Sequence, residues 1–138
     1  SELKGIQIPE DLVPLAIDEF PAVFIAASCA QGETVLTGAK ELRVKESDRI
    51  QVMADGLDIL GIKNEVLEDG IKIQGKSDDI SVFAEIDSFG DHRIAMSFLV
   101  ASLRSEKGMF VKNCKNIFTS FPSFLETMNH LGIHVNEA

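Results

Sequence analysis

Residues 42–50 gather the side chains that could do chemistry. The stretch reads LRVKESDRI, and its charged residues are Arg43, Lys45, Glu46, Asp48 and Arg49. Three of them are cations, and cations gathered in this way can bind phosphate or carboxylate groups. The stretch is therefore a candidate binding site for an anionic ligand.

The residues that follow predict the element that positions these charges. Apolar side chains recur at helical spacing, at Ile50, Met53, Ala54, Leu57 and Leu60. Gly61 is a predicted C-cap, and Ser47 and Glu46 are candidate N-caps, so the charges fall on a loop and the first helical turn. The start of a helix favours anions over cations. Lys45 and Arg49 at this end therefore indicate that an anion lies between them.

A second interpretation needs no ligand. Glu46 and Arg49 lie three positions apart, as do Lys45 and Asp48, which is the spacing of ion pairs on a helix surface. Most runs of charge are solvated surface. From spacing alone, an anion site and a solvated helix face both remain open.

Two almost wholly apolar stretches, 22–30 and 94–103, predict helices that are buried on all sides. Asp18 precedes the first stretch and Asp91 the second, so both aspartates are predicted N-caps. Capping alone would explain their presence. The helices themselves must be covered by neighbouring elements.

Arg93 adds a third cation near such a helix start, next to His92. If the two apolar helices pack side by side, Arg49 and Arg93 could clamp a doubly charged oxyanion close to Asp18. His92 could belong to that site or be only a polar residue of a first turn.

The two aspartates belong to a repeat of about 73 residues. Its other matching segments are GETV at 32–35 with GMFV at 108–111, and LGI at 60–62 with LGI at 131–133. We expect two units, residues 15–78 and 79–138, that share one core. Each unit reads strand, buried helix, strand, amphipathic helix, strand, with one further strand in the first unit.

The spacing of apolar residues in the rest of the chain predicts strands and a further helix, and therefore an α/β fold. Strands are expected at 6–8, 34–36, 64–67, 71–74, 80–86, 109–111 and 133–135, with a hairpin turn at 68–70 and a last helix at 123–131. The 138 residues suit one domain.

Composition excludes several function classes. The net charge of −9 argues against a nucleic-acid partner, and no apolar run is long enough to span a membrane. No signal peptide opens the chain, and Cys29 and Cys114 read as buried, reduced thiols, so we expect a cytoplasmic protein. His130 and His134 are expected at the surface. The chain starts at Ser1 within a predicted strand, so we expect a piece of a longer protein.

Four motifs together carry a family resemblance. IDEFPAVFIAAS at 17–28, LRVKESDRI at 42–50, DHRIAMSFLVAS at 91–102 and TSFPSF at 119–124 resemble the enolpyruvyl transferases of the shikimate pathway. The resemblance runs over essentially the whole chain. It favours the anion site over the solvated helix face.

The resemblance implies a fold of two domains, each an inside-out α/β barrel of three βαβαββ units. This chain would supply two units of the C-terminal domain, with one unit and the N-terminal domain absent. The complete enzyme would be a monomer. The isolated chain is expected to be inactive and, because it would expose apolar surface, to self-associate.

The resemblance also implies a reaction, the transfer of the enolpyruvyl group of phosphoenolpyruvate to the 5-hydroxyl of shikimate-3-phosphate without a metal or organic cofactor. Asp18 would be the general base and Glu46 the proton donor. The substrate-binding residues would be Asp18, Lys45, Arg49, His92 and Arg93. Thr119 departs from many members, which carry a phosphoenolpyruvate-contacting lysine there, and is similar to the glyphosate-tolerant subgroup.

Two other functions stay open. The sister enzyme transfers enolpyruvyl to UDP-N-acetylglucosamine, but it uses a reactive loop cysteine, and Cys29 and Cys114 sit among apolar neighbours. A non-catalytic phosphate-binding or assembly module is the other alternative.

Overall fold

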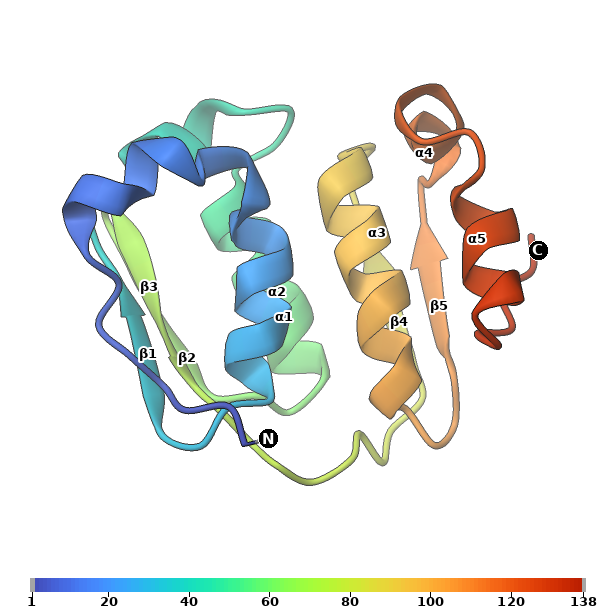
Figure 1. The fold of residues 1–138 in the computed structure, drawn as a ribbon, viewed down its shortest axis with the longest axis horizontal. Coiled ribbons are helices and arrows are strands. Elements are labelled where there is room, and N and C mark those ends of the chain that lie inside the picture. The colour runs from blue at the N-terminus through green and yellow to red at the C-terminus, as the bar shows by residue number, and fades with distance from the viewer. Residues whose placement is uncertain (1, 138) are drawn as a thin grey trace.

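Two α/β units follow one another along the chain in the computed structural model, which describes residues 2–137 (Figure 1). The first unit contains the 3-10 helices η1 (Glu10–Leu15), η2 (Ile17–Glu19) and η3 (Lys40–Val44), the helices α1 (Phe20–Ser28) and α2 (Arg49–Ile59), and the strands β1 (Glu33–Leu36), β2 (Asn64–Leu67) and β3 (Gly70–Gln74). The second contains β4 (Ala84–Asp87), α3 (His92–Ala101), η4 (Ser102–Arg104), β5 (Met109–Lys112), α4 (Lys115–Ser120) and α5 (Phe124–His130).

Among residues 2–137, the strands form two separate sheets. The first has the order β1-β3-β2 and is antiparallel, and the predicted turn at 68–70 joins β2 to β3. Residues 4–7 run parallel to β1 through isolated bridges. In the second sheet β4 pairs with β5 in parallel. In both halves of the chain, a parallel strand pair is thus connected through an apolar helix, α1 or α3, and residues 4–7 of the first pair precede the predicted unit 15–78.

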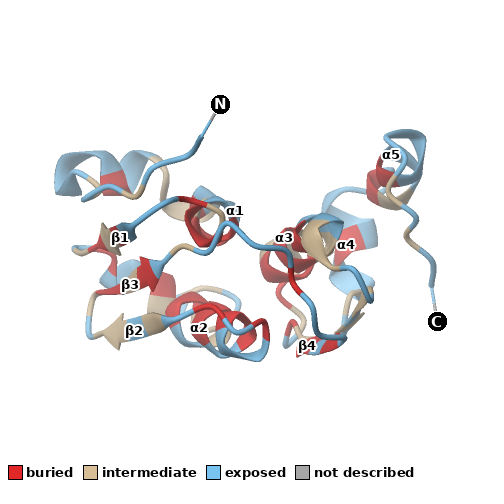
Figure 2. Cartoon of the chain, turned by 90° about the horizontal axis from the view of Figure 1, so that it is seen from below, coloured by how far each residue is buried: buried red, intermediate tan, exposed pale blue. Residues whose placement is uncertain are grey.

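The core spans both units. Helices α1 and α2 lie between the three-stranded sheet and α3, and buried residues line the facing sides of all three helices (Figure 2). Phe24 of α1, Leu57 of α2 and Phe98 of α3 are each at most 1% exposed and belong to one cluster. Packing between the units therefore fixes the three helices relative to one another.

Three helices share one direction, and this matters for the site. The colour gradient of Figure 1 shows that α1, α2 and α3 all begin at the same end of the molecule. Their unpaired N–H groups and positive dipole ends meet there. Within residues 2–137, no helix combines the length and apolar character needed to cross a membrane.

Gly56 shows how tightly the units pack. A Cβ added to Gly56 of α2 would overlap the ring of the fully buried Phe98 on α3. Gly56→Ala is therefore expected to lower the unfolding free energy by about 1–2 kcal/mol, because overpacking costs about 1–3 kcal/mol and helix propensity returns up to about 1 kcal/mol. Urea unfolding measures this, with the exposed Asp55→Ala as control; a stabilised Gly56→Ala would contradict the packing.

The apolar helices are less enclosed than predicted. Ala22 and Ala26 of α1 are exposed, and Val100 of α3 is 41% exposed. The prediction of burial on all sides was therefore wrong for one face of each helix, because no element among residues 2–137 covers these positions.

The end of the chain also differs from prediction. Residues 133–135 form no strand; instead the side-chain amide of Asn129 donates to the carbonyl of Val135 and accepts from its N–H, both at 3.0 Å. Helix α4, which was not predicted, is anchored by the buried Ile117 and ends before Pro122. The predicted strand at 80–86 begins only at Ala84, preceded by a single bridge at Ile80.

Candidate active site

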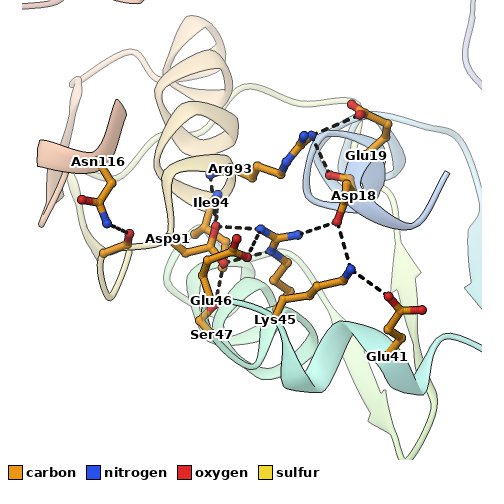
Figure 3. A network of polar contacts seen from close by, with 12 residues as sticks. Asp18, Glu19, Glu41, Lys45, Glu46, Ser47, Asp91, Arg93, Ile94 and Asn116 are labelled. Carbon is orange, nitrogen blue, oxygen red and sulfur yellow. Dashed lines mark hydrogen bonds and ion pairs between the residues drawn. The ribbon is translucent and has the colours of Figure 1, made fainter. Parts of the chain in front are cut away.

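Most of the charged side chains singled out in the sequence meet in one network where α1, α2 and α3 begin (Figure 3). Asp18 lies in η2 directly before α1, Lys45 and Glu46 lie in the loop between η3 and α2, and Arg93 lies in the first turn of α3. Arg49 is the first residue of α2. The site is thus composed of residues from both units.

Arg49 is the centre of the network and is only 1% exposed. Its guanidinium donates through Nε to Asp91 Oδ2 at 2.9 Å, through Nη1 to Asp18 Oδ1 at 3.2 Å and through Nη2 to Glu46 Oε2 at 2.6 Å. A buried cation needs such partners, because an unpaired charge in the interior is costly. Three carboxylates therefore surround one guanidinium.

Asp91 is the buried member of these three carboxylates, with no exposed surface. It accepts from Arg49 and from Ser47 Oγ at 2.9 Å, and it caps α3 by accepting from the backbone N–H groups of Arg93 and Ile94. Burial alone would raise the pKa of Asp91, but the bonds from Arg49 and Ser47 hold it below its ordinary value. Asp91 is therefore ionised at neutral pH.

Asp18 connects the remaining cations. Its carboxylate, 48% exposed, lies 3.2 Å from Lys45 Nζ, and its backbone carbonyl accepts from Arg93 Nη1 at 3.0 Å. The bond from Lys45 is the main cause of a lowered Asp18 pKa, with the charges of Arg93 and Arg49 adding to it. In return, Glu41 and Asp18 raise the pKa of Lys45. Asp18 is ionised and Lys45 charged across the neutral range.

Arg93 reaches the same place from α3. Its Nη1 also pairs with Glu19 at 3.1 Å, and its side chain is 34% exposed. A groove of about 180 Å³ between α1 and α3 adjoins Asp18 and Arg93. Two arginines from different units therefore contact one residue, Asp18, one through its carboxylate and the other through its carbonyl.

The structure corrects two cap assignments. Asp18 caps no helix, because its carboxylate bonds to Lys45 and Arg49 instead and α1 begins without a side-chain cap. The cap of α2 is Asp48, which accepts from the N–H of Gln51 at 3.1 Å, rather than Ser47 or Glu46. Gly61 ends α2 at φ +74° as predicted.

Several residues singled out in the sequence lie outside the network around Arg49. Arg43 holds the β2–β3 hairpin, donating to the carbonyls of Leu67 and Glu68, and pairs with Asp48 at 2.8 Å. His92 is half-buried at the start of α3, and Thr119 lies exposed on α4. His130 and His134 are exposed, as predicted.

Sequence reasoning missed the buried pair of Arg49 and Asp91. Asp91 was predicted only as a helix cap, and Arg49 either as an anion clamp or as the helical ion-pair partner of Glu46. The structure has the Glu46 pair, and it also pairs Arg49 with Asp91. The two lie 42 positions apart, beyond the reach of any helical spacing rule. Cys29 and Cys114, predicted as buried thiols, are free but only half-buried.

The carboxylates of the site should make the fold sensitive to acid. Asp18 and Asp91 have pKa values below the ordinary 3.8 of the carboxyl group. A lowered carboxyl pKa contributes stability above the unfolded pKa and loses it as the pH falls through the folded one. The urea midpoint should therefore fall as the pH drops below about 4, and less so in Asp91→Asn. Equal acid profiles in both proteins would contradict this assignment.

Comparisons with known proteins show which family the chain is similar to. A sequence model described as EPSP synthase (3-phosphoshikimate 1-carboxyvinyltransferase) matches residues 2–128. The chain is 62% identical to the 3-phosphoshikimate 1-carboxyvinyltransferase of Vesicomyosocius okutanii subsp. Calyptogena okutanii (strain HA), over 99% of this chain and 31% of that relative. The protein of the same name from Legionella pneumophila (strain Paris) is 56% identical, with the same two shares.

A solved structure is similar throughout. EPSP synthase from Acinetobacter baumannii superimposes with a TM-score of 0.93 at 56% identity, over 98% of this chain and 32% of that one. The chain thus spans about a third of the length of the relatives it matches. From the family match over most of its residues and this superposition, we conclude that the chain belongs to the EPSP synthase family.

Proposed function

We propose that this chain forms one wall of the active site of an enzyme that transfers the enolpyruvyl group of phosphoenolpyruvate to the 5-hydroxyl of shikimate-3-phosphate. Phosphate is the second product, and the reaction serves the synthesis of aromatic amino acids. One observation carries the proposal beyond family membership: Lys45, Arg49 and Arg93 all contact Asp18 where three helices begin.

The cations suit the two substrates, which are both multiply charged anions. Arg49 and Arg93 are the groups best shaped to bind carboxylate and phosphate through paired donors. The dipoles of α1, α2 and α3 add positive potential at the same end. Fixed positive charge of this kind also favours departure of the phosphate leaving group.

The carboxylates suit the chemistry. Addition of the hydroxyl to phosphoenolpyruvate needs a proton donor at the methylene carbon and a base at the hydroxyl. Glu46 and Asp18 bond to the two terminal nitrogens of one guanidinium, and both are about half exposed. We assign Glu46 as the donor and Asp18 as the base. The tetrahedral intermediate then loses phosphate from its central carbon and a proton from the new methyl group, which restores the carbon–carbon double bond.

Lys45 adjusts the strength of this base. Its bond to Asp18 lowers the pKa of that carboxyl, which keeps it ionised but makes it a weak proton acceptor. When an anionic substrate takes Lys45 as its partner, Asp18 loses this bond and becomes more basic. The base is therefore strengthened by the arrival of the substrate.

We further propose that the chain is two repeat units of the C-terminal domain of such an enzyme, units 15–78 and 79–138, in a monomeric cytoplasmic protein. The two free cysteines fit a reducing compartment. Alone, the chain is expected to show no turnover, since it spans about a third of its relatives. Its exposed apolar side chains favour self-association.

A chimera tests the function. This chain should replace the matching third of Acinetobacter baumannii EPSP synthase, and phosphate release should be measured with phosphoenolpyruvate and shikimate-3-phosphate. We expect turnover within about tenfold of the parent enzyme, and none with UDP-N-acetylglucosamine as control acceptor. A folded chimera without turnover, or one active only on the UDP-sugar, would refute the proposal.

A further inference from the structure

We propose that Asp91 is a positioning residue for phosphoenolpyruvate: it holds the inner edge of the Arg49 guanidinium so that the outer nitrogens can exchange their partners for the ligand. The inference rests on the proposed function of Arg49 as a substrate-binding residue. It gives Asp91, which has so far been only a helix cap and ion-pair partner, a role in the reaction.

The contacts of Arg49 divide into an inner and an outer set. On the inner side, Nε and Nη2 face Asp91 at 2.9 and 3.4 Å, and that carboxylate is fully buried. On the outer side, Nη1 and Nη2 face Asp18 and Glu46, whose side chains are 48% and 53% exposed. An anion arriving from solvent can displace the outer carboxylates but cannot reach the inner one.

This division keeps the buried positive charge of Arg49 paired while its outer contacts change. A guanidinium that is 1% exposed cannot be left without a counter-charge while it changes partners. Asp91 supplies that counter-charge permanently, so Asp18 and Glu46 are free to leave Arg49 when a ligand binds. Both of them are then available for proton transfer.

Asp91 also ties the two units together. Its Oδ2 accepts from Ser47 Oγ in the loop before α2, while its Oδ1 accepts from the N–H groups of Arg93 and Ile94 in α3. The same carboxylate therefore sets Arg49 of the first unit against the start of the helix that carries Arg93. Displacement of either arginine would therefore change the distance between the two guanidinium groups that are proposed to bind the anion.

Asp91→Asn separates this role from helix capping. Asparagine caps a helix about as well as aspartate, but it carries no charge. While its one oxygen caps α3, it has no second oxygen to accept from Arg49 and Ser47, which both donate to Asp91 Oδ2. The matched control is Asp48→Asn at the cap of α2, where the carboxylate pairs with Arg43 instead. A purely structural cap would respond alike at both positions.

The first measurement uses this chain and needs no activity. The Nε–H of Arg49 should give a resolved NMR signal protected from exchange with water. Asp91→Asn should abolish that protection, whereas Asp48→Asn, Asp18→Asn and Glu46→Gln should retain it. Protection that survives in Asp91→Asn would overturn the inference, whatever the chain's function.

The second measurement uses the chimera. Asp91→Asn should raise KM for phosphoenolpyruvate by about 100-fold, the scale expected for misplacement of a binding group, with a smaller change in kcat. In an Arg49→Gln background, the same substitution should change KM little further. A full additional effect there would overturn the inference. An unchanged KM in Arg49→Gln alone would instead refute the proposed role of Arg49.

Discussion

Asp18→Asn is expected to lower kcat of the chimeric enzyme by about 10²–10⁴-fold, the usual contribution of a general base. The amide keeps the shape of the carboxylate but cannot take the proton of the substrate hydroxyl. Because the Asp18 side chain is 48% exposed and caps no helix, the variant should remain folded. Steady-state kinetics with both substrates, together with circular dichroism, measures the two effects separately.

The control for this variant is Asp11→Asn, an exposed carboxylate in η1 with no contact to the network. It should leave kcat unchanged. An Asp18→Asn enzyme whose kcat stayed within tenfold of the unmodified chimera would remove Asp18 from the role of base. A rate lost together with the circular dichroism signal would show that Asp18 is structural instead.

Arg49→Met is expected to lower the unfolding free energy of this chain by about 3–5 kcal/mol, the cost of removing one partner from a buried ion pair. The reason is Asp91, which has no exposed surface and would be left without its cation. Urea unfolding at neutral pH measures the change. In the chimera, the same variant should also raise KM for phosphoenolpyruvate at least as much as Asp91→Asn does.

Two comparisons make this result interpretable. Arg49→Met/Asp91→Asn should recover most of the lost stability, because it removes both charges and keeps a capping side chain. Lys40→Met, which breaks the exposed pair with Glu68, should change the unfolding free energy by less than about 0.5 kcal/mol. An Arg49→Met variant as stable as Lys40→Met would show that Asp91 does not depend on Arg49.

Much of the fold was predictable because its signals are local. The apolar spacing from Ile50 to Leu60 predicted α2, and Gly61 marked its end. The turn residues at 68–70 predicted the β2–β3 hairpin. The strand predicted at 133–135 is absent. Alternating apolar residues also occur in segments without a strand partner, and here the side chain of Asn129 holds the segment instead.

The sequence predicted that Asp18, Arg49 and Arg93 would lie close together, but it did not predict which side chains would pair. The position of Lys45 and Arg49 at a helix start, against the helix dipole, was the signal that singled them out. That signal indicates a negative charge nearby, but it does not identify the group that carries this charge. In the structure, the negative charge beside Arg49 comes from Asp18, Glu46 and Asp91, two of which lie far away in the sequence. Only packing between the two units brings them together.

The most direct test of this account is a crystal structure of the chimera with phosphoenolpyruvate and shikimate-3-phosphate bound. We expect the outer nitrogens of Arg49 and the guanidinium of Arg93 to contact the carboxylate or phosphate of the donor substrate, with Asp18 released from Arg49 and turned to the 5-hydroxyl. Asp91 should keep its bond to Arg49 Nε. Ligand bound elsewhere, with Arg49 still paired to Asp18 and Glu46, would contradict the account.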